Sequence, residues 1–353
     1  MSDRRGDRGE TGQVPIALQR VDAPLTRSAV FLVVTVAGGE EAMDTVRAVL
    51  ADVDGLVKTV GFRDLEAPLS CVVGIGSRIW TDLTGRAAPA ELHPFREVAG
   101  ARHTAPATPG DLLFHIRADR QDLCFELERL LLEALGDAVT TVDEVAGFRY
   151  FDTRDLLGFV DGTANPVGAE LPESTLVGDE DPHNAGGSYV VVQKYVHQMD
   201  AWEALSTEEQ EAVIGRRKAD GVELDDAEPG HQQAHKTLTT IDDGAGGELA
   251  ILRDNMPFGR PGQGEFGTYF IGYARRLWVI ERMLERMFVG DPPGLHDRIL
   301  DVSTALTGTT FFVPTADVLS ALTAPPAAAP EPAPGPSLGI GSLRPSGPEA
   351  PAA

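Results

Sequence analysis

The run AVFLVVTVAGGEEAMDTVRAVLADVDGLVKTV (29–60) decides the fold, because two different periodicities meet in it. Residues 29–38 are apolar and rich in β-branched side chains, which predicts a buried strand. From residue 40 the apolar positions recur every three or four residues, as on one face of a helix. These positions are Met43, Val46, Val49, Leu50 and Val53. The run therefore predicts a strand followed by an amphipathic helix.

The segments that follow extend this unit to the order βαββαβ. Further strands are predicted at 69–76, 111–119 and 138–150. A second helix is predicted at 122–135, with its leucines on the inner face: Leu123, Leu127, Leu130 and Leu131. This order is typical of a ferredoxin-like domain.

The second half of the chain repeats the order more loosely, without residue-level identity. The predicted strands are 188–199, 248–255, 267–274 and 307–314, and the predicted helices are 199–215 and 275–290. Ser206 suits an N-terminal cap within the first of these helices. We therefore predict an α+β fold of two ferredoxin-like halves packed sheet against sheet.

Four regions follow from this pattern. They are a flexible leader (1–27), an N-terminal ferredoxin-like domain (28–155), a C-terminal ferredoxin-like domain (156–318) and a disordered tail (319–353). The tail is rich in proline and alanine, a composition that cannot build a core. It carries one short apolar island, SLGIGSLR (337–344), formed by Leu338, Ile340 and Leu343.

The composition narrows the functions open to the chain. A formal net charge of −24 repels phosphate backbones, so nucleic acids are not expected partners. Cys71 and Cys124 belong to no CxxC pair, which argues against a zinc site, an iron–sulfur cluster and a disulfide framework. No secretory signal and no apolar run of about 18 residues is present, so we expect a cytoplasmic protein without a membrane span.

The stretch LLGFVDGTANP (156–166) lies between the two halves, where a cleft is expected. Its glycines, Asn165 and Pro166 are turn formers, and Asp161 could simply cap a turn. The position of the stretch favours a functional loop.

The chain resembles the dye-decolourising (DyP-type) haem peroxidases through four motifs in that family's order. GFVDGTANP is similar to the family's GxxDG signature. His235 follows in HQQAHKTLTT, then Arg253 and Asn255 in ILRDNMPFG, and the segment 297–314 resembles the family's ending. The resemblance covers about residues 28–318. It implies a barrel-like fold around haem b, and the absence of CxxCH predicts that the haem is not covalently attached.

The resemblance implies His235 as the axial ligand of the haem iron, with His231 as the alternative. A carboxylate usually supports such a histidine, and Asp297 is favoured over Asp301. If the segment DRILD is helical, these two carboxylates lie one turn apart.

On the opposite side of the haem, the resemblance implies that Asp161 transfers the peroxide proton. Arg253 would stabilise the charge on the departing oxygen, and Asn255 would orient water or peroxide. A simpler possibility for Arg253 is an ion pair with Asp254. Arg216 resembles the arginine that binds a haem propionate, with Arg217 as the alternative.

The resemblance also implies the reaction and the partners. Hydrogen peroxide would be the oxidant, and phenolic or dye-like molecules the reductants, with Mn(II) as a further candidate. Several tyrosines and tryptophans are candidate electron relays, and the sequence does not choose among them. SLGIGSLR resembles the peptide that loads cargo enzymes into encapsulin shells, so Leu338, Ile340 and Leu343 would bind the shell protein of a nanocompartment. A homo-oligomer is expected.

Two other functions stay open on the sequence alone. One is a haem-handling protein that stores the cofactor or releases its iron. The other is a cofactor-free cargo protein with the same fold. A haem absorption band and its response to peroxide distinguish the three.

Overall fold

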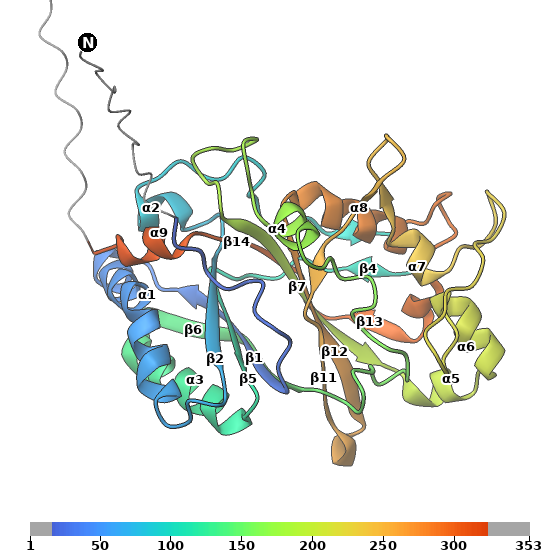
Figure 1. Ribbon diagram of the computed structural model, residues 1–353, viewed down its shortest axis with the longest axis horizontal. Helices are drawn as coiled ribbons and strands as arrows, with labels where there is room; N and C mark the ends of the chain where they lie inside the picture. The colour runs from blue at the N-terminus through green and yellow to red at the C-terminus, as the bar shows by residue number, and fades with distance from the viewer. Residues whose placement is uncertain (1–15, 324–353) are drawn as a thin grey trace, which may run out of the picture. The chain divides into compact units, whose positions relative to one another are not determined.

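The computed structural model describes residues 16–323, and most of its strands join one antiparallel sheet (Figure 1). Their order is β10-β12-β7-β14-β2-β5-β1-β6, with β11 also paired to β12 and β13 to β7. In each half the first strand lies between the third and the fourth, which is the ferredoxin-like arrangement. The predicted fold is confirmed.

The N-terminal half follows the predicted order closely. Its main elements are β1 (Ser28–Val36), α1 (Glu40–Gly61), β2 (Leu69–Ile75), β5 (Leu112–Ala118), α3 (Gln121–Leu135) and β6 (Val139–Phe148). The smaller elements are α2 (Trp80–Thr84), the hairpin β3 (Val98–Ala99) and β4 (Thr104–Ala105), and the 3-10 turn η1 (Gly136–Ala138).

The C-terminal half is more irregular. Before β10 it contains α4 (Glu170–Thr175), β7 (Ser188–His197), α5 (Met199–Glu203), α6 (Thr207–Ile214), α7 (His235–Leu238), β8 (Ile241–Asp242) and β9 (Glu248–Leu249). Then follow β10 (Leu252–Arg253), β11 (Met256–Arg260), η2 (Pro261–Gln263), β12 (Glu265–Ala274), α8 (Leu277–Phe288), η3 (Arg298–Asp301), β13 (Ser303–Ala305), β14 (Thr309–Val313) and α9 (Ala316–Ser320).

Two predicted elements of this half are broken in the structure. The helix predicted at 199–215 is two short helices, because Ser206 starts a new one. Its side chain accepts from the Glu209 amide while the Glu209 carboxylate accepts from the Ser206 amide. The strand predicted at 248–255 is the two short strands β9 and β10.

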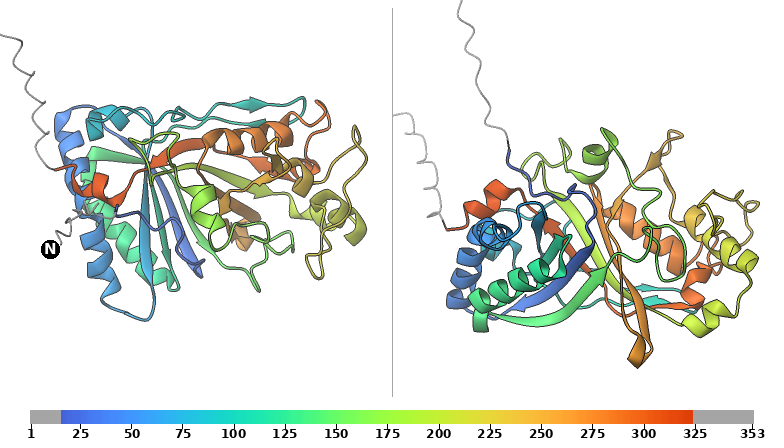
Figure 2. Two further views of the ribbon diagram at one scale, coloured as in Figure 1. Left: turned by 45° about the horizontal axis from the view of Figure 1, so that its top comes forward. Right: turned by 60° about the horizontal axis from the view of Figure 1, so that its bottom comes forward.

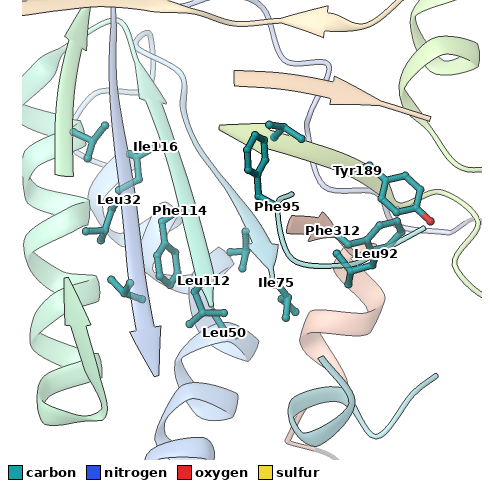
Figure 3. Close-up of a cluster of buried hydrophobic side chains, with 14 of the residues drawn as sticks. Leu32, Leu50, Ile75, Leu92, Phe95, Leu112, Phe114, Ile116, Tyr189 and Phe312 are labelled. Carbon is teal, nitrogen blue, oxygen red and sulfur yellow. The ribbon is translucent and has the colours of Figure 1, made fainter. Parts of the chain in front are cut away.

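Helices cover the outer face of the sheet in both halves. α1 and α3 lie over the N-terminal strands and α8 lies over the C-terminal ones (Figure 2). Figure 3 shows Leu32, Phe114 and Ile116 of the strands near Leu50 of α1, all buried in one apolar cluster. The apolar helix faces predicted from the sequence therefore pack against the outer face of the sheet.

The inner face of the sheet encloses a second apolar cluster. Its largest members are Phe31, Phe258, Tyr269, Tyr273 and Phe311. β6, at one end of the sheet, lies against β11 near the other end, so the sheet curls toward a barrel. Gly147 permits this approach, because a Cβ at that position would lie 2.4 Å from Met256 Cβ.

This packed interior corrects one expectation. The space between the two half-sheets holds side chains and leaves no room for a haem there. Each half-sheet has an apolar inner face, and the two inner faces bury each other. A site for a large cofactor must lie elsewhere in the chain.

The segment 16–27, expected as part of a flexible leader, is packed against the fold. Gln19 donates to the carbonyls of Val73 at 3.0 Å and Pro314 at 2.9 Å, and it accepts from the Val73 amide at 2.8 Å. Val21 joins the inner apolar cluster. The predicted targeting peptide at 337–344 lies outside the described residues. Within residues 16–323, the helices lack the length and apolar character that crossing a bilayer requires.

Candidate active site

Strand alternation directs Arg253 away from the packed interior. Its neighbour Leu252 belongs to the inner cluster, and its other neighbour, Asp254, forms a buried ion pair with Arg117 at 3.0 Å. Arg253 between them faces the opposite side of the sheet. There its Nη2 lies 3.7 Å from Met283 Sδ on α8. The Arg253 guanidinium therefore lies on the helix-covered face of the C-terminal half, and its ion pair with Asp254 is not formed.

Asn165 holds the loop of Asp161 against β10. Its Nδ2 donates to the Arg253 carbonyl at 2.7 Å, and its Oδ1 accepts from the Arg253 amide at 2.9 Å. Gly162, at a φ of 75°, makes the turn between Asp161 and Asn165. The sequence predicts Asn165 only as a turn former, and its two hydrogen bonds across 88 residues leave no local pattern.

Asp161, Arg253 and Asn255 line one pocket. The three residues predicted for peroxide chemistry are thus brought together from two separate segments. The remaining wall comes from both halves of the chain: Leu25, Arg149, Tyr150, Thr153, Arg154, Gly162, Asp254, Met256 and Pro257.

Burial raises the pKa of Asp161 above its ordinary value. The Gly162 amide, the positive charge of Arg253, a hydrogen bond from Asn255 and the charge of His235 oppose that rise. Asn255 is itself fixed, since its Oδ1 accepts from the Ile271 amide at 3.2 Å. Asn255, predicted to orient water or peroxide, therefore lies close to Asp161.

His235 begins α7 and contacts a buried carboxylate. Its Nδ1 lies 2.6 Å from Oδ2 of Asp297, whose side chain is 0% exposed. The other oxygen of Asp297 accepts from the Ile299 amide at 3.1 Å and caps η3. Within residues 16–323 no protein group bonds His235 Nε2. This ring is held by one nitrogen and offers the other as a ligand.

The alternatives to this pair have other partners. The His231 ring bonds only the Glu228 carbonyl, at 3.3 Å, and is exposed. Asp301 bonds His103 and His296. The segment DRILD is a 3-10 turn that Asp297 caps from outside, so Asp297 and Asp301 do not share a helix face.

Arg216 lies near the site, and Arg217 does not. The charge of Arg216 contributes to lowering the pKa of Arg253, after the larger effect of burial. Arg216 Nη2 bonds Glu223 at 2.5 Å and Nη1 bonds the Gly221 carbonyl at 3.2 Å. Arg217 pairs with Asp220 on the surface.

The donor set fits an iron porphyrin. A neutral imidazole backed by a buried carboxylate is the usual axial ligand of haem iron. The charges of His235 and Arg253 both act on Asp161, and that of Arg216 acts on Arg253. These four side chains therefore lie within range of one another's charges.

Comparisons with known proteins identify the family of the chain. Residues 19–149 match the family model for the N-terminal part of the Dyp-type peroxidases, and residues 152–318 match the model for the C-terminal part. The dye-decolorizing peroxidase of Mycolicibacterium paratuberculosis is 57% identical over 334 residues, which cover 94% of this chain and 93% of that protein.

Solved structures show the same similarity. A variant of DypB from Rhodococcus jostii RHA1 in complex with heme is 57% identical with a TM-score of 0.83, covering 86% of this chain and 97% of that chain. Another DypB variant is in complex with manganese. The encapsulated DyP-type peroxidase from Mycobacterium smegmatis is 56% identical with a TM-score of 0.84, covering 88% of this chain and 99% of that one.

Proposed function

Because this chain belongs to the Dyp-type peroxidase family and is a haem peroxidase, we propose that His235 is the axial ligand of its non-covalently bound haem. The observation that carries this proposal is the 2.6 Å contact between His235 Nδ1 and buried Asp297. It leaves Nε2 as the ligand atom and fixes the orientation of the imidazole ring. Bound haem supplies an iron that exchanges electrons with peroxide and with the reducing substrate.

Asp161, Arg253 and Asn255 act on the peroxide. The O–O bond breaks heterolytically when a proton leaves one oxygen and reaches the other, and the Asp161 carboxylate carries that proton. The Arg253 guanidinium stabilises the negative charge on the departing oxygen. Asn255, whose Oδ1 is fixed by the Ile271 amide, orients the water or peroxide by hydrogen bonding.

Arg216 binds a haem propionate. A guanidinium suits a carboxylate, and its charge lies close enough to Arg253 to affect that residue's pKa. Glu223 bonds Nη2 of Arg216. A haem propionate would therefore either displace Glu223 or bind another nitrogen of the guanidinium.

The reducing substrates are phenolic or dye-like molecules, with Mn(II) as a further candidate. The net charge of −24 attracts divalent cations, and a variant of the related DypB has been solved with manganese. The sequence and fold permit both classes of reductant. A homo-oligomer is the proposed assembly.

The C-terminal peptide directs the enzyme to an encapsulin nanocompartment in the cytoplasm. Support comes from the apolar residues Leu338, Ile340 and Leu343 in an otherwise Pro/Ala-rich tail, and from the encapsulated relative of Mycobacterium smegmatis. Co-expression with a shell protein tests the proposal. Changing the three residues to serine should abolish loading, whereas three alanine-to-serine changes in the linker should not. Equal loading of both variants would refute the assignment.

A spectrum taken before and after one equivalent of hydrogen peroxide tests the catalytic proposal. The purified protein should show a haem Soret band that changes rapidly and returns when a phenol is added. A His235→Ala variant should lose stable haem binding, whereas His231→Ala should keep it. A Soret band that does not respond to peroxide would favour haem handling, and a His235→Ala variant with normal haem affinity would refute the ligand assignment.

A further inference from the structure

Three potential metal ligands meet outside the site described above. They are His103, in the turn between β3 and β4, His296, which precedes η3, and Asp301, the last residue of η3. Nearly two hundred residues separate His103 from the other two. None of the three has a part in the proposed peroxide chemistry.

Their ligand atoms converge on one point. Nε2 of His103 lies 3.1 Å from Asp301 Oδ1, and Nε2 of His296 lies 3.0 Å from the same oxygen. All three atoms lie within 4.8 Å of one another. In a tetrahedral zinc site, bonds of about 2.0–2.1 Å separate neighbouring ligand atoms by roughly 3.4 Å. The ligand atoms of His103 and His296 lie up to 4.8 Å apart, so one imidazole would have to move by roughly 1.4 Å to admit a cation.

The backbone around these side chains is fixed before any ion binds. The Gly100 amide donates to the His103 carbonyl at 2.9 Å and closes the β3–β4 turn. A Cβ at position 100 would lie 1.8 Å from the Phe288 carbonyl oxygen, so the turn packs directly on the end of α8. On the other side, Gln232 Nε2 donates to the His296 carbonyl at 2.9 Å.

The donor set and the exposure define the ligand. Two imidazoles and one carboxylate suit borderline cations such as Zn²⁺ better than the hard cations Ca²⁺ and Mg²⁺. The side chains are 25%, 11% and 32% exposed for His103, His296 and Asp301, so water can reach the point between them. Arg298 Nε lies 3.9 Å from Asp301 Oδ2, and this positive charge makes the site weaker than a closed structural zinc centre.

We propose that His103, His296 and Asp301 bind one divalent cation of the zinc class, with water as the fourth ligand. The ion would join the β3–β4 turn to η3. Because Asp297 caps η3 and holds His235, the ion would also restrain the segment that supports the axial histidine.

The test uses the full-length, tag-free haem protein after dialysis against a chelator. Zinc chloride is titrated by calorimetry, and bound zinc is counted by elemental analysis. We expect one Zn²⁺ per chain and an X-ray absorption spectrum with two imidazoles per zinc. His103→Ala should weaken binding at least tenfold while leaving the Soret band unchanged. Asp301→Asn should weaken it similarly while retaining a hydrogen-bond acceptor for the two rings.

His93→Ala is the matched control, because His93 Nε2 also faces a carboxylate, Glu281, at 3.2 Å but without a second histidine. It should bind zinc as the wild type does. Substoichiometric binding by the wild type, or equal affinity of the His103→Ala and His93→Ala variants, would overturn the site. Neither result depends on peroxidase activity.

Discussion

Replacing Asp297 by asparagine tests the support of the axial histidine. Asp297 is fully buried, accepts from His235 at 2.6 Å and caps η3 through its other oxygen at 3.1 Å. Asparagine keeps an oxygen for the cap but removes the charge. A hydrogen bond to a charged group contributes about 1.5–3 kcal/mol. Loss of such a partner typically weakens metal binding about 10- to 100-fold.

We therefore expect the haem Kd of Asp297→Asn to rise by that factor, measured from the Soret band during titration of the apoprotein. The reduction potential of the iron should also rise, because the imidazole becomes a poorer electron donor. Asp301→Asn, compared with the wild type in the presence of a chelator, is the control, since Asp301 belongs to the same turn but does not contact His235. The free energy of unfolding of Asp297→Ala should be about 1 kcal/mol lower than that of Asp297→Asn, because alanine also removes the cap of η3. Haem affinity within twofold of wild type and an unchanged potential in Asp297→Asn would refute the reasoning.

Three further outcomes are expected. Arg253→Leu should keep its haem but react with peroxide about 10²- to 10³-fold more slowly in stopped-flow measurements, and a wild-type rate would disprove its role. That reaction should accelerate as pH rises through a value above the ordinary range of aspartate, because burial raises the pKa of Asp161 and only the carboxylate accepts a proton. An unchanged pH profile in Asp161→Asn would contradict this. Glu128→Gln should raise the melting temperature above pH 7 but not below pH 4.5, because burial raises the pKa of Glu128 from 4.5 to about 7 and the ionised form destabilises the fold. Equal shifts of the melting temperature at both pH values would contradict this expectation for Glu128.

Periodicity predicted the long elements because their burial is one-sided. The strand and helix of 29–60 appear as β1 and α1, and 275–290 appears as α8. β11 was missed because Pro257 and Gly259 lie within it, and both are unfavourable in strands. The pairing of β2 with β14 was also missed, since contacts between distant strand edges leave no local pattern.

The chemistry of the site was easier to predict than its place. Asp161, Arg253 and Asn255 line one pocket, and His235 contacts Asp297. The apolar filling of the space between the half-sheets was not predicted, because apolar alternation alone does not reveal which inner faces cover each other. The ligand and catalytic roles of these site residues stay predictions until the variants above are measured.

The two half-sheets meet through one pair of opposed residues, Phe312 and Ile75, and share their inner apolar cluster. In a chimera that takes its two halves from different relatives, the inner apolar faces of the two half-sheets would not match. The edges of β2 and β14 would then be left without a stable partner. Such a hybrid should precipitate rather than fold, since unpaired edges recruit other chains. Recombination libraries would do better to inherit all inward-facing positions from a single parent and to vary only the helix-covered side.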